Sequence, residues 1–311
     1  MEKIFITGGA GFIGQALAKQ LLKNGYGVKT FDIVEPTETI CEHEVDTIMY
    51  QDELFNAMKG YDYVVHLAAM LGVRRTEQKR MGCLDINIQG TKNVLEVSVK
   101  TGIKKIIFCS SSEVYGDSYI SPIKESGPVS PKSVYAVSKL AGEEYVKAHH
   151  QTHGIAYSIV RLFNVYGPGQ VAQFVMPRFI KTVLENKQPV IYGSGEQKRC
   201  FCYVDDAATG MALALSKPEA DGEIFNIGND KTEISMADLA RKVISLTGKD
   251  MEPRFIALEE SDRSANREIM ERVPDITKAR KVLGYEPKVS LEDGILRTIE
   301  NGNIKDSWDA F

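Results

Sequence analysis

Tyr135 and Lys139 form a pair of residues that can do chemistry together. They lie four residues apart in a segment of helical character, so their side chains share one face of the helix. A free tyrosine has a pKa of about 10, which makes it a poor base at neutral pH. A fixed positive charge nearby favours the phenolate and lowers that pKa. The pair therefore indicates a base that takes a proton from an alcohol, although the same spacing also stabilises ordinary helices.

A glycine-rich turn near the start of the chain indicates nucleotide binding. Lys3–Thr7 is predicted to be a short buried strand, and the segment 15–24 has helical character. Between them, Gly8, Gly11 and Gly14 follow a GxxGxxG spacing. Such glycines allow a tight turn and a close backbone approach to a pyrophosphate, with a helix N-terminus directed at the anion. The order strand, glycines, helix predicts a dinucleotide site.

Asp32 refines the choice of dinucleotide. It ends a second predicted strand, 27–31, about 20 residues beyond the glycines. A carboxylate at that place accepts hydrogen bonds from the hydroxyls of the adenosine ribose, and it repels the additional phosphate of NADP. The sequence therefore predicts NAD as the cofactor.

Composition and charge narrow the class of protein. The chain has 311 residues and a net charge of -4, and no basic stripe points to nucleic acid. No apolar run reaches the roughly 18 residues that span a bilayer, and a strand begins too early for a signal peptide. Five cysteines without a CxxC pair predict reduced thiols in a cytoplasmic protein, and no metal site is expected.

Strands alternate with helices through the first half of the chain. After an irregular polar stretch up to about residue 50 and a short helix at 54–59, the expected strands and helices occupy 63–69, 84–101, 105–109, 134–149 and 156–162. Such alternation predicts an α/β fold with a doubly wound parallel sheet, that is, a Rossmann domain over residues 1–166. A strand near 223–228 is expected to return to this sheet, and helices are expected at 239–247 and 276–283. The remainder, 167–311, is expected to be a smaller substrate-binding α/β region over the cleft.

The chain resembles the extended short-chain dehydrogenase/reductases of the nucleotide-sugar epimerase/dehydratase group, from residue 3 to about 297. The resemblance rests on ordered motifs in this sequence: Thr7-Gly8-Gly9-Ala10-Gly11-Phe12-Ile13-Gly14, Asp32, His66-Leu67-Ala68-Ala69, Asn87-Ile88-Gln89-Gly90-Thr91, Ser110-Ser111-Ser112-Glu113-Val114-Tyr115-Gly116, Tyr135 with Lys139, Arg161 to Pro168, and Arg199 with Tyr203-Val204-Asp205-Asp206. These motifs imply the family, and they say less about the member within it.

The resemblance implies a mechanism and a set of cofactor contacts. Tyr135 would take the proton from the sugar 4-hydroxyl, Ser111 would hydrogen-bond the same oxygen, and the hydride on carbon 4 would pass to NAD. Lys139 would also hold the nicotinamide ribose. The positions implied to bind the cofactor are Gly8, Gly11, Phe12, Ile13, Gly14, Asp32, Leu67, Ala68, Ala69, Tyr135 and Lys139.

The resemblance also implies a nucleotide-diphosphate sugar, UDP- or GDP-linked, as the substrate. Asn164 and the backbone near Val175 match nucleotide-holding positions, and Arg199 is the expected ligand of the diphosphate, because a guanidinium fork suits phosphate oxygens. Ser112 and Arg263 are further expected contacts of the sugar. The alternatives are a surface salt bridge of Arg199 to Asp205 or Asp206, and a solvated loop around Arg263.

Glu113 bears on which reaction follows oxidation. Simple 4-epimerases of the family usually carry a small or hydroxyl residue at this position, whereas hexose 4,6-dehydratases and uronate decarboxylases carry glutamate. A ketone at carbon 4 makes the proton on carbon 5 acidic, so a glutamate can start elimination or can position a ring that loses its carboxylate. Ser112 departs from the Asp-Glu pair of the dTDP-glucose-type dehydratases. The sequence favours a lyase step, and 4-epimerisation is the next reaction to consider. A structural interpretation is also open, in which Glu113 points to solvent or caps a helix.

Two other functional hypotheses differ in what happens to the cofactor. A non-catalytic NAD-binding regulator would bind NAD without redox change, and a dehydrogenase would release NADH at each turnover.

The family usually forms homodimers through two helices, here about 85–101 and 134–150. Their apolar residues are also explained by core packing: Val94, Leu95, Val99, Leu140 and Tyr145.

Overall fold

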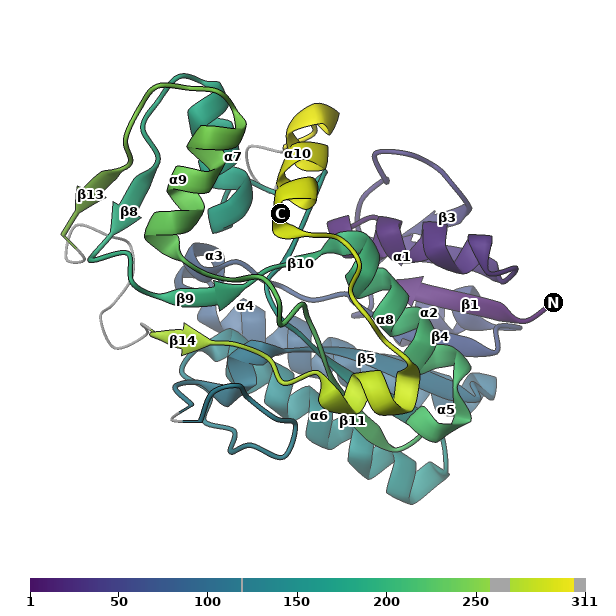
Figure 1. The fold of residues 1–311 in the computed structure, drawn as a ribbon. Helices are drawn as coiled ribbons and strands as arrows, with labels where there is room; N and C mark the ends of the chain where they lie inside the picture. The colour runs from purple at the N-terminus through teal and green to yellow at the C-terminus, as the bar shows by residue number, and fades with distance from the viewer. Residues whose placement is uncertain (119, 258–268, 305–311) are drawn as a thin grey trace.

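The computed structural model describes residues 1–118, 120–257 and 269–304, and its centre is a parallel sheet (Figure 1). The sheet has seven strands in the order β11-β6-β5-β4-β1-β2-β3, and each neighbouring pair is parallel. The strands are β1 (Lys3–Thr7), β2 (Gly27–Asp32), β3 (Glu42–Val45), β4 (Tyr63–His66), β5 (Lys105–Ser111), β6 (Ala156–Leu162) and β11 (Glu223–Ile227). This is the predicted doubly wound sheet, and β11 is the predicted returning strand.

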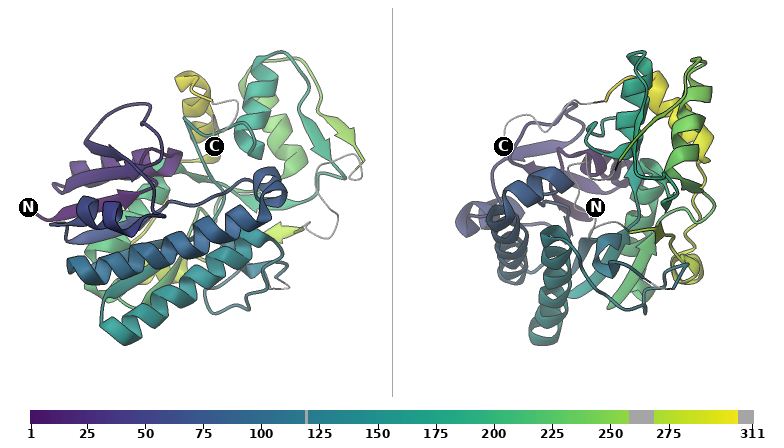
Figure 2. Two further views of the ribbon diagram at one scale, coloured as in Figure 1. Left: turned by 180° about the vertical axis from the view of Figure 1, so that it is seen from behind. Right: turned by 90° about the vertical axis from the view of Figure 1, so that its left-hand side faces the viewer.

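Helices cover both faces of the sheet. On one face α1 (Phe12–Lys23) packs beside α8 (Val204–Ser216), and on the other α5 (Gly90–Thr101) lies between α2 (Gln51–Met58) and α6 (Val134–His153). The left view of Figure 2 shows α5 and α6 side by side. Side chains of β1 alternate between the two layers. Because both faces are covered, the central strands read as apolar runs without polar alternation.

Several elements differ from the sequence prediction, among them the expected helix 276–283, where the structure has a short π-helical segment at Ala279–Leu283. The stretch that was expected to be irregular contains β3, whose acidic residues Glu42 and Glu44 pair with Lys29 of β2. A polar edge strand has no apolar period, so its pattern is not recognisable. The expected helix 84–101 consists of α4 (Arg80–Leu84), a π-helical turn at Asp85–Gln89 and α5. The predicted strand 63–69 stops at His66.

A second region, drawn in green and yellow at the upper left and centre of Figure 1, covers the carboxyl ends of the strands. It contains α7 (Val175–Leu184), α9 (Met236–Leu246) and α10 (Leu291–Asn301), which share one apolar core. Short strands complete it: β7 (Val165–Tyr166) with β10 (Cys202–Tyr203), β8 (Val190–Tyr192) with β13 (Arg254–Ile256), and β9 (Lys198–Cys200) between β12 (Glu233–Ser235) and β14 (Glu271–Arg272). The short helical segments are α3 (Val73–Gln78), η2 (Ser112–Tyr115), η3 (Pro218–Ala220) and η6 (Ala279–Leu283).

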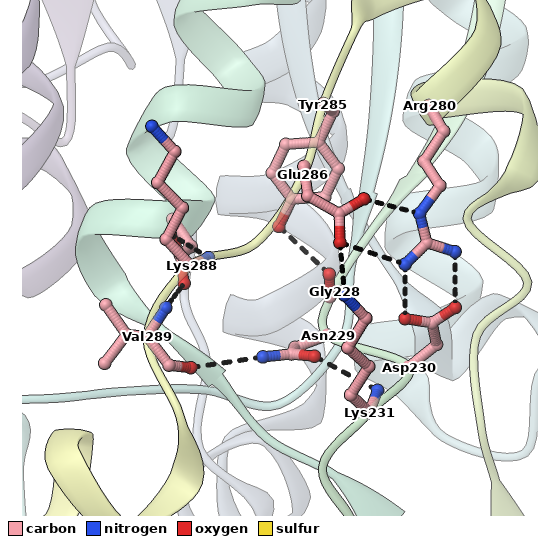
Figure 3. A network of polar contacts seen from close by, with 10 residues as sticks. Gly228, Asn229, Asp230, Lys231, Arg280, Tyr285, Glu286, Lys288 and Val289 are labelled. Atoms are coloured by element: carbon pink, nitrogen blue, oxygen red, sulfur yellow. Dashed lines mark hydrogen bonds and ion pairs between the residues drawn. The ribbon is translucent and has the colours of Figure 1, made fainter.

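A polar network fastens the loop after β11 to the segment that leads into α10 (Figure 3). Arg280 donates to both carboxylate oxygens of Asp230, at 2.6 and 2.8 Å, and its Nε donates to Glu286 at 2.7 Å. The buried Tyr285 hydroxyl donates to the carbonyl of Gly228 at 2.9 Å. The chain is therefore fixed at the place where it leaves the sheet and returns to the second region.

Three global properties complete the description. All five cysteines are free thiols. Within residues 1–118, 120–257 and 269–304, no helix is both long and apolar enough to cross a membrane. The same residues contain no cluster of three or more His, Cys, Asp or Glu side chains arranged for a metal ion.

Candidate active site

A cavity of about 1150 Å³ lies where the carboxyl ends of the strands meet the second region. Ligands of doubly wound sheets bind at this edge. All the described residues that the sequence predicted for the site line this cavity: Gly8, Gly11, Phe12, Ile13, Gly14, Asp32, Leu67, Ala68, Ala69, Ser111, Ser112, Glu113, Tyr135, Lys139, Asn164, Val175 and Arg199. Arg263 lies outside the described residues.

The glycine turn brings three backbone segments closer together than side chains permit. Gly8 has φ +72°, and a Cβ atom there would lie 2.6 Å from the backbone nitrogen of Ala68. A Cβ atom on Gly14 would lie 2.5 Å from the carbonyl oxygen of Gly8. Helix α1 begins after Gly11 without a side-chain cap and without an acidic residue in its first turn. The bare N-terminus therefore presents N–H groups to the cavity, as a pyrophosphate requires.

Asp32 is fixed beside this turn by two backbone N–H groups. Its Oδ2 accepts from Ala10 at 3.0 Å and its Oδ1 accepts from Ile33 at 2.8 Å. Burial raises the pKa of Asp32, and these hydrogen bonds oppose that effect by stabilising the carboxylate. The turn, the bare helix end and the carboxylate together fit a dinucleotide with an unmodified ribose.

Helix α6 carries both Tyr135 and Lys139, and both side chains line the cavity. Its N-cap is Ser133, whose Oγ accepts from the backbone N–H of Ala136 at 3.0 Å. The Nζ atom of Lys139 lies 5.8 Å from the centroid of the Tyr135 ring and donates to the carbonyl of Cys109 at 2.7 Å. The lysine is buried, and burial lowers its pKa.

The expected depression of the phenol pKa is wrong for the chain on its own. The pKa of Tyr135 is raised well above 10, first by burial and then by the nearby Cys109 thiol and Glu113 carboxylate. A hydrogen bond with the Ser111 side chain acts in the opposite direction and does not offset burial. The sequence shows which groups are near one another, but it does not show how far they are removed from water.

Glu113 lines the cavity and also supports helix α6. Its backbone N–H donates to the Ser111 Oγ at 3.2 Å, and its Oε2 accepts from the Ser133 hydroxyl at 3.1 Å. The Glu113 carboxylate therefore faces the cavity and Ser133, and it does not simply point to solvent. The capping interpretation is partly right, because the carboxylate bonds the residue that caps α6.

Two arginines lie side by side in the part of the cavity that the second region forms. Arg199 in β9 and Arg272 in β14 are register partners, and both line the cavity. The Nη2 of Arg199 donates to the carbonyl of Ile269 at 2.6 Å, and the Nη2 of Arg272 donates to the Oδ1 of Asn164 at 3.1 Å. The sequence analysis missed Arg272, because short strands that pair across some 70 residues leave no local pattern.

Helix α7 supplies a second bare N-terminus beside these arginines. It begins after Phe174 without a side-chain cap and without an acidic residue in its first turn, and Val175 and Met176 line the cavity. Among the described residues, those from 164 onward that line the cavity include no Asp or Glu, so the polar groups seen on this side are neutral or cationic, which suits a diphosphate. The cavity thus has two ends suited to phosphate, and between them lie the half-buried Tyr135 and Ser111 and the buried Lys139.

Comparisons with known proteins agree with this geometry. The family model "NAD dependent epimerase/dehydratase family" matches residues 4–228. The chain is 35% identical to the UDP-N-acetyl-alpha-D-glucosaminuronate decarboxylase of Bacillus cytotoxicus, over 96% of this chain and 97% of the relative.

Solved structures extend the likeness to the fold. A UDP-glucose 4-epimerase of Thermotoga maritima, solved with UDP-glucose, matches with a TM-score of 0.89 and 32% identity over 96% of this chain and 98% of the other. A dTDP-glucose 4,6-dehydratase of Streptomyces venezuelae, solved with NAD bound, matches with a TM-score of 0.88 and 30% identity over 96% of each chain. NAD is the cofactor that the glycine turn and Asp32 fit. The chain belongs to the NAD-dependent epimerase/dehydratase family, whose members are enzymes that act on nucleotide sugars.

Proposed function

We propose that this enzyme oxidises the sugar of a nucleotide-diphosphate sugar at carbon 4 and then completes a lyase step, either 4,6-dehydration or decarboxylation of a uronate. When bound, NAD supplies the hydride acceptor for carbon 4 and later returns the hydride. The observation that carries the proposal is the position of Glu113, which lies in the same cavity as Ser111, Tyr135 and Lys139 and acts electrostatically on the Tyr135 phenol.

The chain's own residues have distinct roles in the oxidation. Tyr135 takes the proton of the 4-hydroxyl, Ser111 hydrogen-bonds the same oxygen, and Lys139 holds the nicotinamide ribose. Because burial raises the pKa of Tyr135, the proton transfer needs positive charge beyond that of Lys139. We assign that charge to the oxidised cofactor. With a ketone at carbon 4, Glu113 then takes the carbon 5 proton in a dehydration or orients the ring in a decarboxylation.

The substrate end of the cavity holds the diphosphate. Arg199 and Arg272 supply guanidinium groups, the N-terminus of α7 supplies backbone N–H groups, and Asn164 fixes Arg272. We propose a UDP-linked substrate, as in the decarboxylase and the 4-epimerase named above, with a GDP-linked sugar as the alternative. Ser112 is buried in the cavity lining between Ser111 and Glu113 and is a proposed contact of the sugar.

Product mass tests the proposed reaction. The purified protein is incubated with UDP-, dTDP- and GDP-linked hexoses and with UDP-linked uronic acids, and the products are followed by mass spectrometry. A lyase releases water from a hexose or carbon dioxide from a uronate, so the sugar loses the corresponding mass. Tyr135→Phe is the control and abolishes every product. A product of unchanged mass with inverted carbon 4 rejects the lyase step.

The second candidate is 4-epimerisation, and one contact favours it. The Oε2 of Glu113 already accepts from the hydroxyl of Ser133, so this carboxylate also has a structural task. Glu113→Gln separates the two functions, because the amide keeps an acceptor for Ser133 but cannot act as a base. A 4,6-dehydratase, in which Glu113 is the base, loses its activity by about two orders of magnitude or more, whereas an epimerase keeps its activity within several-fold.

The quaternary structure and compartment are further proposals. We propose a homodimer through α5 and α6. Val94 and Leu95 are buried in the core, so the half-buried Val99, Leu140 and Tyr145 are the apolar residues left for the interface. Light scattering on the purified protein measures the mass, and a monomer at micromolar concentration rejects the dimer.

Five free thiols suit a reducing compartment, so we propose that the enzyme lies in the cytoplasm.

A further inference from the structure

A buried ion pair lies one helical turn beyond Lys139. Glu143 of α6 is 0% exposed and Arg161 of β6 is 3% exposed. The Nε of Arg161 donates to the Oε1 of Glu143 at 2.9 Å, and its Nη2 donates to Oε2 at 2.6 Å. This bidentate geometry is the strongest arrangement of a carboxylate with arginine. The pair lies behind the cavity, so it does not line the site it adjoins.

The same carboxylate ties α6 to strand β5. The hydroxyl of Ser110 donates to the Oε1 of Glu143 at 2.5 Å. One turn earlier on α6, Lys139 donates to the carbonyl of Cys109, the preceding residue of β5. Helix and strand are therefore joined at two successive turns. The next residue of β5 is Ser111, so these contacts set the distance between Ser111 and the side chains of α6.

Arg161 also contacts η2, the segment that contains Glu113. Its guanidinium lies 4.7 Å from the centroid of the Tyr115 ring in η2, and its Nη1 donates to the carbonyl of Glu125 at 3.2 Å. The hydroxyl of Tyr115 donates to Asn226 of β11 at 2.7 Å. The pair thus connects β5, β6, α6 and η2, and through Tyr115 also β11.

The charge of Glu143 also matters to Lys139. The groups that face this ammonium are the Cys109 thiol on β5, the Cys83 thiol on α4, His66 on β4 and the Tyr135 phenol on its own helix. Burial lowers the pKa of Lys139, and the carboxylate of Glu143 opposes that shift. Glu143 is therefore a counter-charge for the buried ammonium as well as a mechanical contact.

We propose that Glu143, held by Arg161 and Ser110, is a positioning residue that fixes α6 against β5 and places a carboxylate one helical turn from the Lys139 ammonium. This role rests on the proposed function, in which charged Lys139 binds the nicotinamide ribose. It extends the functional set beyond the residues that line the cavity.

The test compares Glu143→Gln with Glu125→Gln. Glutamine keeps an acceptor for Ser110 and Arg161 but removes the charge, so we expect kcat to fall by about five- to twenty-fold with KM within two-fold. The alkaline limb of the pH–rate profile moves to lower pH by at least about half a unit, because Lys139 loses its proton more easily. Glu125→Gln removes a carboxylate of the same network that does not act on Lys139, and it leaves the limb in place.

A second readout does not depend on turnover. NAD affinity is titrated from neutral to alkaline pH, and Glu143→Gln loses affinity at lower pH than the wild-type protein. This measurement keeps the inference testable if the enzyme acts on no offered sugar, an outcome that contradicts the proposed function alone. An unchanged alkaline limb and an unchanged pH dependence of NAD binding overturn the counter-charge role.

Ser110→Ala tests the mechanical role if the charge variant does not fold. It removes one hydrogen bond on the β5 side and leaves the ion pair, so we expect kcat to fall by about two- to five-fold without movement of the alkaline limb. An unchanged kcat overturns the mechanical role, and a shifted limb in Glu125→Gln shows that the charge effect is not specific to Glu143.

Discussion

Five helices of this enzyme illustrate two ways in which a helix begins. Helices α6, α9 and α10 each start at a serine, Ser133, Ser235 and Ser290, whose hydroxyl accepts from a backbone N–H of the first turn. Helices α1 and α7 start without such a cap and without an acidic residue in the first turn. The capped helices position side chains or build the core, whereas the two bare ends face the cavity.

The difference shows how the fold divides its polar groups. A cap satisfies the first N–H groups of a helix within the protein, and a bare end leaves them for a ligand. In α1 the glycine turn clears the space for that ligand, and in α7 the paired Arg199 and Arg272 add positive charge beside it. Substitutions at the two kinds of helix end are therefore expected to have different consequences.

The largest effect is expected at the bare end of α1. In Gly14→Ala the new methyl group would lie 2.5 Å from the carbonyl oxygen of Gly8, so the turn must open. We expect NAD affinity to fall by about a hundredfold or more, measured by calorimetric titration. Gly82→Ala is the matched control, because its Cβ atom would meet no atom nearer than 4.0 Å. Wild-type affinity in Gly14→Ala would contradict the close approach.

An intermediate effect is expected beside the bare end of α7. Arg199→Lys and Arg272→Lys keep the charge but lose the planar fork that matches phosphate oxygens. We expect KM for the nucleotide sugar to rise by about ten- to a hundredfold in each, with kcat changed far less. Steady-state kinetics on both variants measure the split, with exposed Arg254→Lys as the control. A fall in kcat at constant KM would place these residues nearer the reacting carbon.

The smallest effect separates two capped helices. Ser133→Ala and Ser290→Ala each remove an N-cap hydrogen bond, so each lowers the free energy of unfolding by about 1 kcal/mol. Ser133 also donates to Glu113, so only Ser133→Ala is expected to lower kcat, by a few-fold. Chemical denaturation and steady-state kinetics are measured on both. Equal kcat values would show that the contact with Glu113 has no catalytic role.

Local patterns in the sequence were sufficient for the cofactor half of the cavity. The glycine turn, Asp32 and the Tyr135–Lys139 pair each depend on spacing within one strand or helix, and each lies as predicted. Arg272 was missed, because β14 reaches β9 through tertiary structure alone. The direction of the Tyr135 pKa was wrong for a similar reason, since removal from water depends on every element around the ring.

The position of β11 has a consequence for biosynthesis. This edge strand pairs with β6, which ends at Leu162, but β11 is made only after α7 and α8. During synthesis, β6 is therefore without its partner β11 while the residues between them leave the ribosome. Strand β11 is then secured by contacts that include Arg280 and Tyr285, which are synthesised later still. Cotranslational assembly of the two walls of the cavity is thus interleaved, and neither wall is finished before the other has begun.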